Sequence, residues 1–227
     1  MTKLTHFLSV LLLLGASSSS FANMFVDRSI IEFVASEGRQ QDLRVSNRGN
    51  DQMYVQLEVL DVQNPGTEAE QRVTLSNLSD MTLLATPKQF VLPAQGERAV
   101  RLVSLSEASD VERIYRVNVT PVLPPLADND ASVVRVVVAY QLLVIVQPVN
   151  PREDLFVERR GDVMYFENRG NSYVLLSEGE QCHADSCDDL PTRRLYAGNS
   201  WELPLSDAQA AVNFRMSTFQ GSREVTF

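Results

Sequence analysis

The chain has 227 residues, of which 44% are hydrophobic and 22% charged, and its formal net charge is −9 at pH 7. The acidic balance argues against a nucleic-acid partner, because a nucleic-acid-binding surface needs a basic stripe. Lys3 and Lys88 are the only lysines, so an anion-binding site in the body of the chain has to be built mainly from arginine.

Residues 1–22 have the three parts of a secretory signal peptide. Lys3 supplies the positive charge, residues 7–14 form a short apolar core, and residues 20–22 have the small-x-small pattern of a signal peptidase site. We therefore expect cleavage after Ala22 and a mature chain that works outside the cytoplasm. The remaining residues, roughly 205, suit one large or two small domains.

The following stretch alternates short apolar–polar segments with turn residues. The alternation is clearest in residues 53–62, and the turn signals are strongest at residues 47–50 and 64–66. The predicted strands cover residues 41–45, 53–62, 82–86, 90–92, 98–105 and 114–119. Because strands separated by turns at this density are typical of an antiparallel β-sandwich, we expect that fold here.

Residues 132–146, SVVRVVVAYQLLVIV, contain neither Gly nor Pro and are mostly β-branched or aromatic, which is typical of a β-strand. Such a strand would span roughly 50 Å, at about 3.3 Å per residue. One face carries no polar break: Val134, Val136, Val138, Tyr140, Leu142, Val144 and Val146. An exposed apolar strand edge is an aggregation hazard, so we expect this one to pair with another chain.

Two other interpretations of residues 132–146 remain open. The segment could be a transmembrane helix, although it is shorter than the ~20 apolar residues that a span needs and contains Arg135 and Gln141. It could also be an ordinary central strand with no exposed part.

Residues 121–130, rich in Pro and Asp, read as a loop that enters the long strand. Pro148 and Pro151 end that strand and stiffen the connection that follows. We therefore expect a first domain over residues 23–148 and a second, smaller β-domain over residues 149–227. The strands predicted in the second domain cover residues 155–157, 163–168, 173–177, 194–196, 200–203, 212–217 and 224–227.

Cys182 and Cys187 are the only cysteines. In an oxidising compartment we expect them to form a disulfide bond. The alternative is a metal site that includes His183, but the spacing is wrong for the usual two-residue zinc knuckle, and we predict no metal. The chain also has no Gly-rich phosphate loop, HExxH motif or nucleophile motif, so we expect neither an enzyme nor a cofactor.

Several short segments resemble motifs of the periplasmic chaperones of chaperone–usher pili, the PapD-like superfamily. In chain order they are VDRS (26–29), VSN (45–47), ATP (85–87), LP (92–93) with Gly96, VRL (100–102), Tyr115, PP (124–125), QP (147–148), FEN (166–168) and YAG (196–198). Each motif is short, and their shared order covers nearly the whole mature chain. The Tyr115-Arg116 pair and the cysteine loop look more like the archaic or alternate branches.

The resemblance implies an all-β protein of two immunoglobulin-like β-sandwich domains in a boomerang arrangement. It implies that the long strand is lent to an incomplete pilin subunit in the periplasm, a case of β-strand addition, and that the subunit then passes to an outer-membrane usher. The expected donor residues are Val134, Val136, Val138, Tyr140 and Leu142, with Val144 and Val146 in the protein's own core. The alternative is a secreted structural or adhesive β-sandwich protein of a fimbria.

The chain departs from the family pattern at the site that holds the subunit's C-terminal carboxylate. The Arg and Lys that usually form this site fall at Ile30 and Leu143. Because a buried unpaired carboxylate is costly, we expect an arginine to replace them. Arg116 is the first candidate, and Arg28 and Arg101 are weaker ones, since Arg101 could instead form an interdomain salt bridge. We also expect the free protein to hide its apolar strand by self-association or by a mobile loop over residues 121–130.

Overall fold

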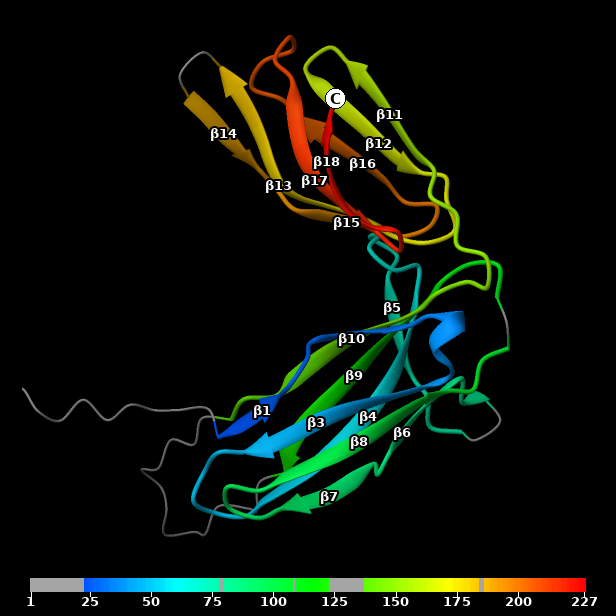
Figure 1. The fold of residues 1–227 in the computed structure, drawn as a ribbon, viewed down its shortest axis with the longest axis vertical. Coiled ribbons are helices and arrows are strands. Elements are labelled where there is room, and N and C mark those ends of the chain that lie inside the picture. The colour runs from blue at the N-terminus through cyan, green and yellow to red at the C-terminus, as the bar shows by residue number, and fades with distance from the viewer. Residues whose placement is uncertain (1–22, 78–79, 108, 123–136, 184–185) are drawn as a thin grey trace, which may run out of the picture.

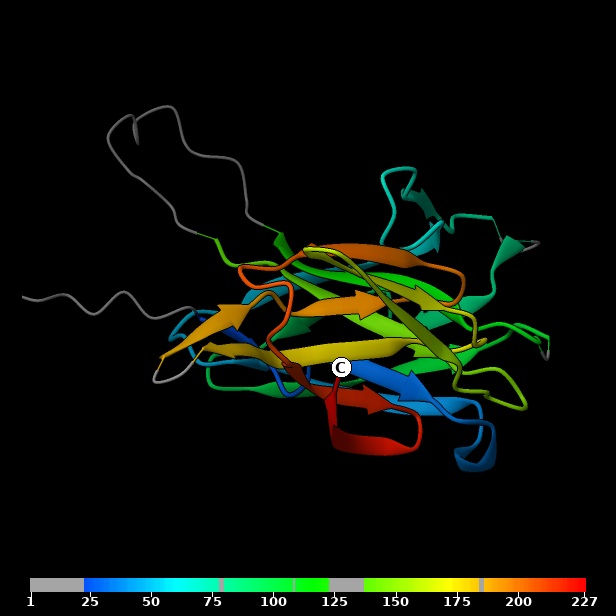
Figure 2. The same ribbon diagram turned by 90° about the horizontal axis from the view of Figure 1, so that it is seen from above.

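The computed structural model describes residues 23–77, 80–107, 109–122, 137–183 and 186–227, and it is built from β-strands (Figure 1). A short 3-10 turn, η2 (Ala35–Glu37), interrupts the strands of the first half of the chain. The strands form two β-sandwiches that meet at one end and diverge from there, in the manner of a boomerang. Seen from above, the second sandwich overlies the first (Figure 2). The predicted all-β fold class is confirmed.

The first sandwich packs a four-stranded sheet against a six-stranded sheet. The four-stranded sheet has the order β1 (Met24–Val26), β3 (Gln40–Asn47), β8 (Glu97–Ser104), β6 (Leu83–Thr86). The six-stranded sheet has the order β2 (Ile30–Phe33), β10 (Tyr140–Val146), β9 (Arg113–Val122), β4 (Met53–Gln63), β5 (Gln71–Thr74), with β7 (Gln89–Leu92) also paired to β4. Neighbouring strands are antiparallel except β2 and β10, which run parallel.

The two-residue period of the sequence sets the core of the first sandwich. In β4 the buried side chains include Val55, Leu57 and Val59, and the residues between them are exposed. In β9 the fully buried side chains include Val117 and Val119. Because successive side chains of a strand point to opposite faces, these positions form one apolar layer, as predicted for residues 53–62.

The second sandwich also packs two sheets around an apolar core. One sheet has the order β11 (Leu155–Arg160), β12 (Val163–Asn168), β16 (Ser200–Pro204), and the other has the order β14 (Ser186–Leu190), β13 (Val174–His183), β17 (Val212–Thr218), β18 (Gly221–Thr226), with β15 (Arg193–Leu195) paired to β13. Phe166 lies at the centre of this core, stacked on Trp201 and edge-on to Phe214. Aromatic pairs of this kind stabilise a core beyond the area that they bury.

The predicted disulfide is confirmed. Cys182 on β13 and Cys187 on β14 lie directly opposite each other and are bonded. A cysteine that binds a metal must be a thiolate, so this bonded pair is not a metal-ligand set even though Glu180 lies close to it.

The long strand is shorter than predicted within the described residues. Strand β10 begins at Tyr140, and residues 137–139 precede it without strand pairing, while residues 132–136 lie outside the described part. The register of β10 with β9 would place Val138 opposite Pro121, and proline has no backbone N–H to donate to a ladder. This explains why the pairing stops. No helix in the described ranges is long and apolar enough to cross a membrane.

Candidate functional site

The apolar face of the long segment changes from exposed to buried along the chain. Val138 is 37% exposed, Tyr140 is half-buried, and Leu142 and Val144 are fully buried in the core of the first sandwich. The Tyr140 hydroxyl donates a hydrogen bond to the backbone oxygen of Met24 at 2.9 Å. The protein therefore covers the C-terminal half of this face itself and leaves Val138 partly uncovered.

Leu142 therefore requires a correction, because we expected it to enter a groove of the partner. Its side chain packs inside the protein's own sandwich, which leaves no surface for another chain. The expectation that Val144 packs in the same core is confirmed, and Val146 packs against that core as a partly buried residue. Val134 and Val136 lie outside the described residues.

The backbone next to this face forms an open strand edge. Strand β2 pairs with β10 only from Leu143 to Val146. The N–H of Leu143 donates to the backbone oxygen of Ser29, just before β2, and the N–H of Gln147 donates to that of Phe33 in β2. By the two-residue period, the N–H groups of Ala139 and Gln141 point to the same side. No described strand pairs with them there, so these two residues offer main-chain groups to an incoming strand.

The structure places Arg116, the first candidate for the carboxylate, in one row of the six-stranded sheet with Ile30 and Leu143. Leu143 lies opposite Ile30 on one side and opposite Arg116 on the other, and Arg116 lies opposite Leu60. Directly opposed residues share one face of a sheet. Arg116 therefore lies one strand away from Leu143 and two strands away from Ile30.

Arg116 projects from the outer face of β9, as predicted from the burial of Tyr115 and Val117 on its inner face. The arginine is half-buried, and its Nε is a buried nitrogen without a hydrogen-bond partner in the described part of the protein. A buried donor without a partner costs free energy.

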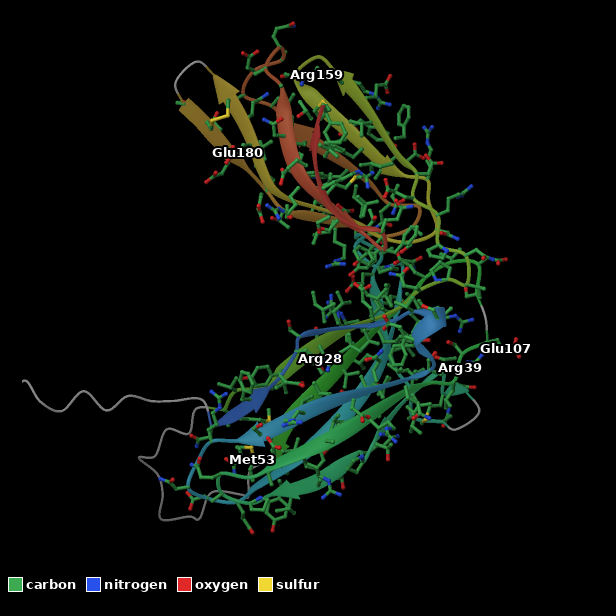
Figure 3. The ribbon with its side chains drawn as sticks, in the orientation of Figure 1. Arg28, Arg39, Met53, Glu107, Arg159 and Glu180 are labelled. Carbon is green, nitrogen blue, oxygen red and sulfur yellow. A yellow bond between two sulfur atoms is a disulfide. The ribbon has the colours of Figure 1, made fainter. Side chains whose placement is uncertain are left out.

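The two weaker candidates lie elsewhere. Arg28 is on the segment between β1 and β2, with its Nε 3.9 Å from the Asp27 carboxylate and its side chain well exposed (Figure 3). Arg101 donates two hydrogen bonds, at 2.8 and 2.9 Å, to Asp42 on the neighbouring strand β3. This bond is the main reason why the pKa of Asp42 is lowered. The salt bridge of Arg101 is therefore within the first sandwich, and the idea that it joins the two domains is wrong.

The two sandwiches meet in an apolar cluster, which we call the domain junction: Val62, Ile114, Leu143, Ile145, Tyr173 and Tyr196. Four of these residues come from the first sandwich and the two tyrosines from the second. The Tyr173 hydroxyl donates to Glu32 of β2, and burial, reinforced by this bond, raises the pKa of Tyr173 to about 12. The row that contains Arg116 thus faces the second sandwich.

Two charged residues of the junction were missed from the sequence. Glu112, which is 8% exposed, accepts hydrogen bonds from the backbone N–H groups of Tyr173 and Ala197, each at 2.9 Å. Burial raises its pKa to about 7. Arg194 of β15 places its guanidinium 4.3 Å from the centre of the Tyr173 ring. Glu112 lies 61 and 85 positions before Tyr173 and Ala197 in the chain, so no local pattern could have brought them together.

Residues 24–151 match the family described as pili and flagellar-assembly chaperone, PapD N-terminal domain. The match covers more than half of the chain, and the protein therefore belongs to this family of assembly chaperones, which are not enzymes.

Particular relatives match along most of the chain. Among curated proteins of Escherichia coli, the CS1 fimbrial subunit protein B is 24% identical over 208 residues, covering 86% of this chain and 85% of the relative. The CFA/I fimbrial subunit protein A is 23% identical over 223 residues, covering 94% and 90%.

Solved structures have the same fold. The class 5 fimbriae chaperone CfaA superposes with a TM-score of 0.67 at 20% identity and covers 90% of this chain and 98% of its own. A chain from the Salmonella enterica complex of the SafA pilin with the SafB chaperone superposes with a TM-score of 0.65 at 17% identity, covering 92% and 98%.

Proposed function

We propose that this protein is a periplasmic chaperone that uses β-strand addition to hold an incomplete pilin subunit, which it delivers to an outer-membrane usher. The observation that carries the proposal is the open edge at Ala139 and Gln141, next to the exposed valines 137 and 138. Main-chain hydrogen bonds from such an edge give affinity, and side chains that enter pockets of the partner give specificity.

The donor set that we propose is Val134, Val136 and Val138, with Tyr140 at its boundary. Each fully buried side chain of this kind is worth roughly 1.5–3 kcal/mol. Three valines would therefore supply on the order of 5 to 9 kcal/mol before the cost of ordering the segment is subtracted. Leu142 is no longer part of the set, because it is already buried in the sandwich.

We propose Arg116 as the residue that binds the subunit's C-terminal carboxylate. Its row also holds the two apolar positions at which the family resemblance places the usual Arg and Lys. A guanidinium fork matches the geometry of a carboxylate. Residues 147–151 would act as the hinge between domains 23–148 and 149–227, and residues 1–22 would direct export to the periplasm.

A structural or adhesive protein of the fimbria is the competing function. The names of the two curated relatives contain the words fimbrial subunit, whereas the chain belongs to a chaperone family. A chaperone is absent from purified fibres and is recovered one-to-one with subunits in the periplasm. A structural protein remains in the fibre.

The experiment is co-expression with the secreted proteins encoded beside this chain, followed by pull-down from the periplasm. Val138→Asp is compared with Val91→Asp, because Val91 on β7 has a similar exposure of 41% and lies away from the open edge. We expect Val138→Asp to lose most of the captured subunit while Val91→Asp keeps it. Equal yields from the two folded variants would contradict the proposal.

A further inference from the structure

The turn that joins β4 to β5 reaches the second sandwich. The two strands pair as far as Gln63 and Gln71, and residues 64–70 connect them. Figures 1 and 2 show this turn close to the second sandwich and well away from residues 147–151, which link the two sandwiches. The tip of the turn, Pro65 and Gly66, is half-buried, whereas residues 67–69 are exposed. The tip is therefore the part of the turn that another element covers.

Hydrogen bonds within the turn hold its shape. The Gly66 N–H donates to the Glu70 carboxylate at 2.8 Å, and Glu70 also pairs with Arg72 at 2.8 Å. The bond from Gly66 is the main reason why the pKa of Glu70 is lowered. Further hydrogen bonds join residues within the range 64–70. Together these bonds fix the direction in which the carbonyl oxygens of Pro65 and Gly66 point.

Two side chains of the second sandwich bind these carbonyl oxygens. Asn199, in the turn between β15 and β16, donates from its Nδ2 to the Pro65 oxygen at 2.8 Å. Arg193 of β15 donates from its Nη2 to the Gly66 oxygen at 3.4 Å. A Cβ atom on Gly66 would lie 2.9 Å from the Asn199 Nδ2 and 3.0 Å from the ring of Tyr196. The tip therefore lies against the second sandwich with no room for another side-chain atom.

Asn199 is held in place by its own sandwich. Its backbone N–H donates to the Tyr196 oxygen at 3.0 Å, and its backbone oxygen accepts the Asn168 N–H at 2.9 Å. The residue is 9% exposed. Because both the backbone of Asn199 and the turn that it binds are fixed, the hydrogen bond to Pro65 sets the position of one sandwich relative to the other.

A separate set of contacts lies beside the link between the sandwiches. Asn171 donates from its Nδ2 to the backbone oxygens of Asp110 and Asn150, at 2.8 and 3.0 Å. Its own backbone oxygen accepts the Glu112 N–H at 3.0 Å. Relative motion of two domains is the default when the interface between them is small. A domain held along one side can still turn about that side, whereas a contact away from it prevents the turning.

We infer that the tip of the β4–β5 turn, Pro65 and Gly66, is a strut that sets the opening between the two sandwiches, and that Asn199 positions the second sandwich on it. The opening is then a property of the free chain, and holding a partner between the sandwiches requires no domain closure. This inference goes beyond the proposed function and does not depend on it, because it concerns the protein alone.

The test measures the distance between two spin labels on the free mature chain by double electron–electron resonance. The labels are attached to Gln89→Cys on β7 and Glu202→Cys on β16, two exposed positions in different sandwiches. Cys182 and Cys187 are bonded to each other, so a thiol-specific label reacts only with the introduced cysteines. Far-ultraviolet circular dichroism checks the fold of every variant. We expect one narrow distance distribution for the chain that carries no further substitution.

The first variant is Asn199→Asp, which keeps the shape of the side chain but replaces the amide donor with an acceptor facing the Pro65 oxygen. We expect its distance distribution to be broader, with a shifted maximum. The control is Asn213→Asp, the same substitution at the start of β17, where Asn213 contacts Thr226 inside the second sandwich. It should keep the distribution of the unsubstituted chain.

The second variant is Gly66→Ala, which places a Cβ against the second sandwich without changing the sequence of that sandwich. We expect a shifted maximum here too, and none for Gly38→Ala, because a Cβ at Gly38 meets nothing within 4 Å. A folded Asn199→Asp or Gly66→Ala chain with the unsubstituted distribution would show that the apolar junction and the contacts of Asn171 suffice, and would overturn the strut. An unsubstituted chain with a broad distribution would overturn it as well. Neither result bears on the pull-down, since no subunit is present.

Discussion

Glu112 predicts an unusual pH dependence of stability. Its carboxylate lies at the domain junction, 8% exposed, and accepts two backbone hydrogen bonds from the second sandwich. Burial raises its pKa from 4.5 to about 7, against the opposing effects of those two bonds and of Arg194, while Glu32 raises it further. We consider how the free energy of unfolding changes when the pH is lowered from 8 to 6.

The sign follows from proton binding. Because the pKa of Glu112 is higher in the folded state than in the unfolded state, the folded protein binds more protons between pH 4.5 and 7. Stability from this group is therefore fully present below the unfolded pKa and is lost as the pH rises through about 7. The free energy of unfolding should thus increase by roughly 1–1.5 kcal/mol when the pH falls from 8 to 6.

The assay is urea unfolding at several pH values, followed by the fluorescence of Trp201, the only tryptophan, and by far-ultraviolet circular dichroism. Glu112→Gln should flatten the slope between pH 6 and 8, and the exposed Glu37→Gln should keep it. The pKa values of Asp42, Glu70 and Glu153 are lowered, so their contribution is lost only in more acidic solution. Wild-type stability that falls toward pH 6, or a slope that Glu112→Gln leaves intact, would contradict this role of Glu112.

Three further predictions concern the junction, the disulfide and the free protein. Gly66→Ala should cost about 1–2 kcal/mol more than Gly38→Ala, because both glycines have positive φ but only a Cβ at Gly66 meets Asn199 and Tyr196, at 2.9 and 3.0 Å; equal melting temperatures would argue against this contact. Replacing both Cys182 and Cys187 with Ser should lower the free energy of unfolding by roughly 2 kcal/mol, measured in urea, with reduced wild-type protein expected to match the variant. Sedimentation of the free protein should reveal concentration-dependent self-association that Val138→Asp abolishes, and a strict monomer at high concentration would count against an uncovered apolar edge.

The sequence predicts most of this fold because its strands repeat every two residues. Two features follow from that period: the alternation in residues 53–62, and the position of Arg116 on the face of β9 that does not carry the buried Tyr115. The disulfide follows from the cysteine count and the compartment. The order of family motifs led to the chaperone family without any single strong motif.

What the sequence could not predict depends on tertiary contacts. The composition of residues 137–139 favours a strand, but the register places Pro121 opposite Val138 and the pairing stops. Leu142 has the same alternation as Val138, yet the sandwich covers one and not the other. Arg194 carries no local signal, since its partner Tyr173 comes from another part of the sequence.

Hydrogen exchange on the complex with a captured subunit tests strand addition most directly. We predict that the backbone amides of Ala139 and Gln141, which no described strand pairs in the free protein, become protected in the complex. The amide of Leu143, already bonded to Ser29, should be protected in both states. A one-to-one complex in which Ala139 and Gln141 exchange as fast as in the free protein would contradict the proposal that this edge holds the subunit.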